Sequence, residues 1–158
     1  MAVDMFLKLG DIKGESTDER RPDWIEVESF SWGALNQLPA VQAAAAAGKV
    51  SFQDFHFVQR VNKASPLLMQ AVCTGEHIPD ATLAVARKAG EKQQDYLIVK
   101  LTDVLVSSYQ TGGSSGADAP MEQVALNFSK IEFQHFAEDG SRTEAASCPS
   151  DPKLRFLK

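Results

Sequence analysis

The sequence predicts an all-β domain, a small closed β-barrel of two bent antiparallel sheets with one short α-helix and a long extended loop. Two observations predict this fold. Runs with apolar residues at every second position recur between Gly, Pro, Asp and Ser, which is the pattern of half-buried strands. In the longer runs this alternation slips by one residue, as it does at a β-bulge or a sharp bend. Strands that bend in this way suit a barrel better than a flat sheet.

The strands are expected at residues 5–9, 24–32, 50–58, 82–86, 96–106 and 123–136. The alternation slips within the longer runs, between Val27 and Phe30, Phe52 and Phe55, Leu101 and Val104, and Phe128 and Ile131. Polar stretches rich in turn formers are expected as surface loops, at residues 14–22 and 111–118. Each slip therefore predicts a bulge or a bend in the middle of its strand.

One helix is expected from residue 65 to residue 74. Ser65 is the predicted N-cap, Pro66 the first helical residue, and Gly75 follows the last turn. The segment is apolar almost all round, so we expect it to pack across an open end of the barrel. Cys73 is then expected to be a small buried side chain.

Composition narrows the functional classes. The 158 residues carry 16 basic and 21 acidic side chains, a net charge of −5, which is typical of one globular domain and unlike a nucleic-acid-binding protein. The first residues contain an acid where a signal peptide is basic, and no apolar run follows them. We therefore expect synthesis in the cytosol and, if the protein is exported, a route other than the general one. Two cysteines, Cys73 and Cys148, exclude a disulfide framework.

A long uncharged segment is the most informative feature. No Asp, Glu, Lys or Arg occurs from residue 29 to residue 48, and the strand alternation vanishes from about residue 33 to residue 48. Pro39 and several polar residues argue against a membrane span. The centre of a protein interface is poor in charge, so the segment is either an arm that docks on another subunit or a loop that folds over its own barrel.

Reactive groups in known patterns are missing from the sequence. His56, His77 and His135 lie far apart, with no further ligand at metal-binding spacing. Ser114 lies in a GxSxG pattern, but no helix follows it, as a nucleophile elbow requires. Gly48-Lys49-Val50 lacks the other residues of a phosphate-binding loop. We therefore expect no enzyme, no cofactor and no metal, and favour an assembly or binding protein.

Several short stretches, taken in order, resemble the Hcp (haemolysin-coregulated protein) family of the bacterial type VI secretion system. They are Met5-Phe6-Leu7-Lys8, Gly14-Glu15-Ser16, Phe30-Ser31-Trp32-Gly33, Gly48-Lys49-Val50, the helix to Gly75, Arg87-Lys88-Ala89-Gly90, Tyr96-Leu97-Ile98, Val104-Leu105-Val106-Ser107-Ser108 and Thr111-Gly112-Gly113. The likeness runs from about residue 3 to residue 136. The tail, residues 137–158, matches poorly, and Ala43 to Ala47 replace the glycines common in relatives.

The resemblance implies a structural subunit of the inner tube. Its partners would be further copies of itself in stacked hexameric rings, the spike and contractile sheath, and small effector proteins in the lumen, with no nucleic acid and no membrane insertion. Assembly would be cytoplasmic, followed by expulsion to the outside or into a target cell. Ser31, opposite in parity to its aromatic neighbours, is a candidate to face the lumen. The candidates for ring stacking are Leu35, Leu38, Pro39, Val41, Gly48 and Lys49.

Three alternatives remain open from the residues. The first is a monomeric barrel that carries a small apolar ligand, with the uncharged segment as a lid. The second is an enzyme that uses Ser114. The third is the tube protein of a contractile phage tail, a class thought to share the fold.

Overall fold

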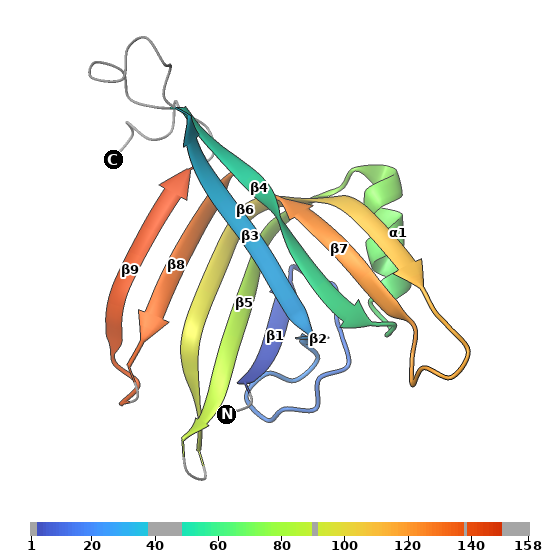
Figure 1. Ribbon diagram of the computed structural model, residues 1–158, viewed down its shortest axis with the longest axis horizontal. Coiled ribbons are helices and arrows are strands. Elements are labelled where there is room, and N and C mark those ends of the chain that lie inside the picture. The colour runs from blue at the N-terminus through green and yellow to red at the C-terminus, as the bar shows by residue number, and fades with distance from the viewer. Residues whose placement is uncertain (1–2, 38–48, 90–91, 138, 150–158) are drawn as a thin grey trace.

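The computed structural model describes residues 3–37, 49–89, 92–137 and 139–149. Figure 1 shows the strands and the helix of this part of the chain. They are β1 (Val3–Leu9), β2 (Ile25–Val27), β3 (Ser29–Gln37), β4 (Lys49–Arg60), α1 (Ser65–Thr74), β5 (His77–Ala89), β6 (Lys92–Gly112), β7 (Met121–Asn127), β8 (Lys130–Phe136) and β9 (Arg142–Pro149).

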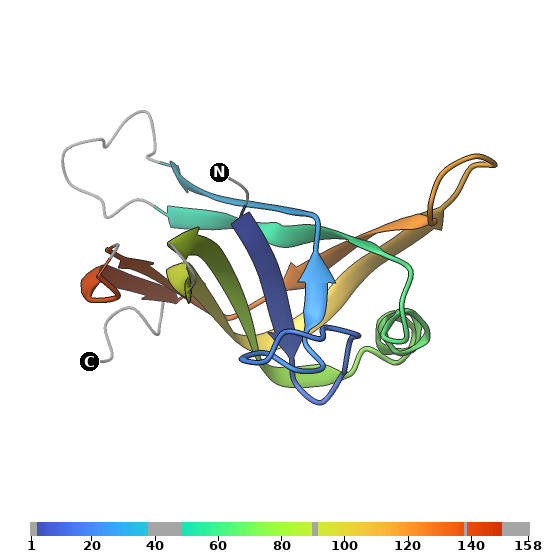
Figure 2. The same cartoon turned by 90° about the horizontal axis from the view of Figure 1, so that it is seen from below.

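The strands form one antiparallel sheet in the order β2-β1-β5-β6-β7-β4-β3, and off this path β8 pairs with β6 and β9 pairs with β8. Across the described residues no hydrogen-bonded ladder joins β2 to β3, so the sheet is open where a fully closed barrel was expected. The two end strands are consecutive in the chain, however, with only Glu28 between them. The chain itself therefore turns that corner, and the sheet wraps around one core (Figure 2).

The predicted corners are present. Between β2 and β3, the amide of Glu28 donates a hydrogen bond to the Val58 carbonyl at 2.8 Å. The register of β3 against β4 shifts between Ser31 and Gly33, which leaves an extra residue on the β4 side. In β6, Asp103 adopts a left-handed backbone with φ of 55°. Two residues, 128 and 129, separate β7 from β8.

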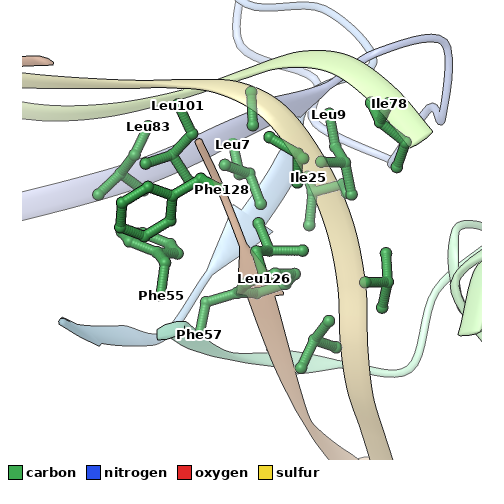
Figure 3. Packing of buried hydrophobic residues seen from close by; sticks show 14 of the residues in the cluster. Leu7, Leu9, Ile25, Phe55, Phe57, Ile78, Leu83, Leu101, Leu126 and Phe128 are labelled. Carbon is green, nitrogen blue, oxygen red and sulfur yellow. The ribbon is translucent and has the colours of Figure 1, made fainter. Parts of the chain in front are cut away.

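Apolar side chains from both halves of the sheet fill the interior. Figure 3 shows Phe55 and Phe57 of β4 directed into the interior, together with Leu126 of the neighbouring strand β7 and with Leu83 of β5 and Leu101 of β6. Each of these five side chains is 2% exposed or less. Full burial of one such side chain stabilises the fold by about 2 kcal/mol. On both sides of each bend the apolar side chains point into the interior, which is why the core is continuous.

Helix α1 ends as predicted. Gly75 has a left-handed backbone with φ of 68°, and its amide donates to the Ala71 carbonyl at 3.0 Å. Leu68 and Ala71 face the sheet and are buried. Cys73 is exposed, so its predicted burial is wrong, because only a narrow side of this helix contacts the sheet.

The start of α1 differs from the prediction. The N-cap is Ala64 rather than Ser65, and no side chain caps the helix. Asn62 Oδ1 accepts the Ala64 amide at 2.8 Å and so organises the turn before the helix. The hydroxyl of Ser65 donates instead to Glu122 Oε2 at 2.9 Å. The Ser65 hydroxyl, which the sequence assigns to capping, is therefore used in a buried tertiary contact.

Two strands extend beyond the predicted boundaries. β3 continues to Gln37, where it pairs with Lys49, so residues 33–37 of the expected arm are strand. β9 was not predicted, because nearly all its side chains are exposed and it shows no apolar alternation. Within the described residues, no helix has the length and apolar character needed to cross a bilayer.

Candidate assembly surfaces

Strands β3, β4 and β7 and the second half of β6 turn a face of small, mostly uncharged side chains outward. Register partners form one row across it, Ser31, His56, Ala125 and Ser108, in which Ala125 is buried, and a second row, Ser29, Val58, Gln123 and Gln110. Ser31 is exposed, whereas Phe30 and Trp32 pack against the core, as their parity predicts. We call these two rows the neutral face.

Charged side chains also adjoin the neutral face. Glu28 and Arg60 form an exposed ion pair, with 3.1 Å between Arg60 Nε and Glu28 Oε1. Asp54 is partnered within the sheet. Its carboxylate accepts hydrogen bonds from Ser107 Oγ at 2.7 Å and from Asn127 Nδ2 at 3.1 Å. Both Asp54 and Ser107 lie at register irregularities, of β4 and β6 respectively. These bonds join three strands where two of them bulge.

The outward face on the other side of the molecule includes a charged row. Across β1, β5, β6, β8 and β9 this row is Lys8, Thr82, Lys100, Glu132 and Ser147, while the next row, Phe6, Ala84, Ile98, Gln134 and Ala145, is uncharged. Lys130 Nζ lies 3.2 Å from Glu132 Oε1. A charged row is typical of a sheet surface in water, whereas the neutral face is a candidate for contact.

The base of the predicted arm is the β3–β4 hairpin. Leu35 is 58% exposed there and pairs with Ser51, and Lys49 is the first residue of β4. The structure thus places Leu35 and Lys49 on the two strands of one hairpin. The other stacking candidates, Leu38, Pro39, Val41 and Gly48, lie outside the described residues.

A buried polar cluster holds the start of α1 against the sheet. Glu122 is 1% exposed, and its carboxylate accepts hydrogen bonds from Gln59 Nε2 at 2.6 Å, from Ser65 Oγ and from the Tyr109 hydroxyl. Burial, together with the hydrogen bond and charge of Glu122, raises the pKa of Tyr109 above its usual value of 10.0.

Sequence reasoning missed this cluster, although a signal for it exists. Gln59 shares the inward parity of Phe55 and Phe57, and Glu122 shares that of Val124 and Leu126. Polar residues on an inward parity in two strands predict a buried pair.

The loop of residues 10–24, between β1 and β2, is fixed by a buried cation. The side chain of Arg21 is 7% exposed and forms an ion pair with Asp95, whose side chain is 25% exposed. The guanidinium also lies over Phe6 and Trp24, 5.8 Å and 5.5 Å from the ring centroids. This contact ties the loop to β1 and β6.

The residues considered for chemistry remain apart. Ser114 is exposed in the β6–β7 turn, where its carbonyl accepts the Ala117 amide at 3.2 Å, so it follows a strand but precedes no helix. His77 pairs with Asp103 at 3.0 Å on the surface. In the ranges that the structure describes, no three His, Cys, Asp or Glu side chains are grouped as metal ligands.

A small wrapped sheet with a filled core, a mostly neutral face and a protruding hairpin suits a structural protein that contacts other chains through that face. Residues 6–135 match the family model described as "Type VI secretion system effector, Hcp". The chain therefore belongs to the Hcp family, whose members are secreted tube proteins of the type VI secretion system.

Individual relatives agree with the family match. The chain is 43% identical over 145 residues to protein Hcp1 of Pseudomonas aeruginosa, covering 90% of each chain. It is similar to the crystal structure of Hcp1 from Salmonella typhimurium, with a TM-score of 0.78, 31% identity, and coverage of 95% of this chain and 96% of that one. A type VI secretion system effector from Yersinia pestis gives a TM-score of 0.77 at 28% identity, over 92% of this chain and 99% of that one.

Proposed function

We propose that this chain forms hexameric rings that stack into the expelled inner tube, with the neutral face as the wall of the channel. The observation that carries the proposal is a neutral outward face in a member of the Hcp family. A head-to-tail contact that closes on itself gives a ring, and a hairpin that reaches along the axis stacks the rings. The chain, residues 1–158, then works as one unit, with its arm near residues 33–48 and the tail at 137–158.

The neutral face suits passage of cargo. Hydroxyl and amide groups, such as those of Ser31 and Gln110, bind water and form weak hydrogen bonds. A wall that is mostly uncharged exerts little force on the net charge of a small effector. The remaining partners are the spike and the contractile sheath. Assembly takes place in the cytoplasm and the tube is then expelled. The subunit needs no catalysis and no cofactor for this role.

The filled interior argues against the monomeric ligand carrier. A carrier barrel needs an open apolar interior, whereas Phe55, Phe57 and Leu126 meet at the centre of this one (Figure 3).

The first experiment measures mass and shape. Size-exclusion chromatography with light scattering should give about six chains per particle, and negative-stain electron microscopy should show annular particles. A single-chain mass at high protein concentration would exclude the ring.

A second experiment tests the arm. Leu38→Asp should leave annular particles intact but shorten or abolish tubes, because a carboxylate is costly to bury in a neutral contact. Leu38→Ile is the matched control and should keep tube length. Unchanged tubes in Leu38→Asp would contradict a stacking role for this residue.

A third experiment tests which face lines the channel. In a Cys73→Ser, Cys148→Ser background, Ser31→Cys should react with a small maleimide in assembled tubes but far more slowly with a maleimide on a long polyethylene glycol chain. Lys100→Cys, on the charged row, should react readily with both. Equal reaction of Ser31→Cys with both reagents would place the neutral face on the outside.

A further inference from the structure

Asp54 of β4 lies on the outward side of the sheet, although strict alternation would direct it inward. Phe52 packs against the core and Phe55 is 0% exposed, so two residues rather than one separate these inward positions. The register of β3 against β4 shifts at this point, and Asp54 has no register partner there. A β-bulge re-aims a side chain in this way. The bulge in β4 therefore brings an acid to the edge of the neutral face.

A second bulge, in β6, supplies a hydrogen bond to this acid. The register of β6 against β7 shifts between Val106 and Ser108, which leaves Ser107 as the extra residue. Ser107 Oγ donates to Asp54 Oδ2 at 2.7 Å, and Asn127 Nδ2 of β7 donates to Asp54 Oδ1 at 3.1 Å. Both carboxylate oxygens are therefore held by neutral donors from neighbouring strands.

The charge of Asp54 is not balanced by a cation. Glu28 and Arg60, which also adjoin the neutral face, pair with each other. Among the residues that the structure describes, no Lys, Arg or His forms an ion pair with Asp54. His56 is exposed two residues further along β4 and is not paired with it either. The Asp54 carboxylate is thus a fixed negative charge in mostly uncharged surroundings.

Assembly would repeat this charge around the channel. In a hexameric ring, rotational symmetry places every copy of Asp54 at the same height along the axis. Rings of Asp or Glu side chains favour cations in channels, because their negative potentials add. A channel wall that is otherwise mostly neutral would then select by charge at this level.

We propose that Asp54 binds cargo in the channel and selects effectors whose surface presents Lys or Arg side chains. This inference rests on the proposed tube function and names the chemistry that the channel recognises. An ammonium or guanidinium group of the cargo donates a charge-assisted hydrogen bond to a carboxylate oxygen that Ser107 or Asn127 already holds. Because the carboxylate is fixed before binding, little side-chain entropy is lost on contact.

The first test measures the binding of charged probes to purified rings. Hexalysine and hexaglutamate peptides that carry the same dye are titrated with the protein in low salt at about pH 8, where imidazoles are ordinarily uncharged. Fluorescence anisotropy should show binding of hexalysine and not of hexaglutamate. Asp54→Asn keeps the shape of the side chain, and it should weaken hexalysine binding by about tenfold. Hexalysine binding as tight as that of the wild type would overturn the inference.

Asp80→Asn is the matched control. It makes the same change of charge at an exposed position on β5, outside the neutral face. Asp80→Asn should bind hexalysine like the wild type. Equal weakening by the two substitutions would overturn the inference, because hexalysine would then respond only to net charge. Both variants should keep the wild-type urea midpoint, which separates a loss of binding from a loss of fold.

A second variant tests the charge of Asp54 without removing the residue. Asn127 is exposed at the end of β7, and its amide already reaches Asp54. Asn127→Lys should supply the missing counterion and weaken hexalysine binding about as much as Asp54→Asn does. Unchanged binding in Asn127→Lys would contradict recognition by Asp54, whether or not Asp54→Asn assembles.

The outcomes separate the two proposals. If rings form but Asp54→Asn binds hexalysine like the wild type, the proposed function stands and the inference fails. If the wild type forms no rings, the proposed function fails. The comparison of Asp54→Asn with Asp80→Asn on single chains then decides whether Asp54 recognises cations.

Discussion

Two segments cover the sheet, α1 and the loop of residues 10–24 (Figure 2). A buried side chain anchors each of them, and the two side chains carry opposite charges. α1 is held through a buried acid, Glu122, which accepts hydrogen bonds from three neutral donors. The loop is held through a buried base, Arg21, which pairs with Asp95 and lies over two aromatic rings. Glu122 therefore has no counterion among its hydrogen-bonded partners, whereas Arg21 depends on the counterion Asp95.

The difference shows how a buried charge is matched to its surroundings. Ser65 is the first residue of α1, so the positive end of the helix dipole helps to stabilise the Glu122 carboxylate. Arg21 has no helix end beside it in β1 or β6, and its charge is balanced by Asp95 and the electron-rich ring faces. The anchor of α1 should therefore be insensitive to salt, while the anchor of the loop should respond to it.

Removing the acid should have the largest effect on stability. Glu122→Ala leaves the donors of Gln59, Ser65 and Tyr109 buried without an acceptor, so the free energy of unfolding should fall by about 4 kcal/mol. Equilibrium urea denaturation at fixed protein concentration measures this, because ring formation makes stability depend on concentration.

The control for Glu122→Ala is Glu144→Ala, at an exposed position on β9. It should change the free energy of unfolding by less than about 0.5 kcal/mol. Equal, small effects of the two substitutions would show that the cluster does not anchor α1.

The second largest effect should come from Gly14, in the covering loop. A Cβ at this position would lie 2.6 Å from Trp24 O and 2.6 Å from Ile25 Cα, and backbone atoms cannot move aside as a side chain can. Gly14→Ala should therefore destabilise the protein by about 3 kcal/mol.

Gly112→Ala is the matched control for Gly14→Ala, since a Cβ at Gly112 meets nothing within 4 Å. It should leave the urea midpoint unchanged. If Gly14→Ala is equally neutral, the loop is not packed as tightly against β2 as the structure has it.

The barrel architecture was predictable because each corner leaves a mark in the alternation. The slip between Phe52 and Phe55 is the β4 bulge, and the slip between Leu101 and Val104 is the left-handed residue Asp103. β9 could not be predicted because both of its faces are exposed, and apolar alternation arises only where one face of a strand is buried. The continuation of β3 was missed for the same reason, because this edge strand is exposed at Leu35.

The parts of the assembly surfaces that depend on tertiary contacts were not predictable. Ser65 reads as an N-cap because its place before Pro66 is the usual one, and only the position of Glu122 shows why its hydroxyl points elsewhere. Ser31 was placed on an exposed face by parity alone.

The salt response separates the two anchors. Arg21→Ala should cost about 2 kcal/mol, through loss of the ion pair and of the contacts with Phe6 and Trp24. Asp95 is partly exposed, so salt screens the pair, and the cost of Arg21→Ala should shrink in concentrated sodium chloride. The cost of Glu122→Ala should not. Urea denaturation at low and high salt measures both, and parallel salt responses would contradict the distinction drawn between the two anchors.

The smallest effect concerns the ionisation of Tyr109. Burial and Glu122 raise the pKa of Tyr109, so folding favours its neutral form. The resulting stability is fully present below the ordinary tyrosine pKa and is lost as the pH rises through the raised value. The chain has two tyrosines, so in Tyr96→Phe the phenolate absorbance reports on Tyr109 alone. The midpoint of the Tyr109 titration should lie above that of free tyrosine and should move back toward it in Glu122→Gln. If Glu122→Gln leaves the midpoint unchanged, burial alone raises the pKa of Tyr109. Tyr109 would then not belong to the anchor of α1.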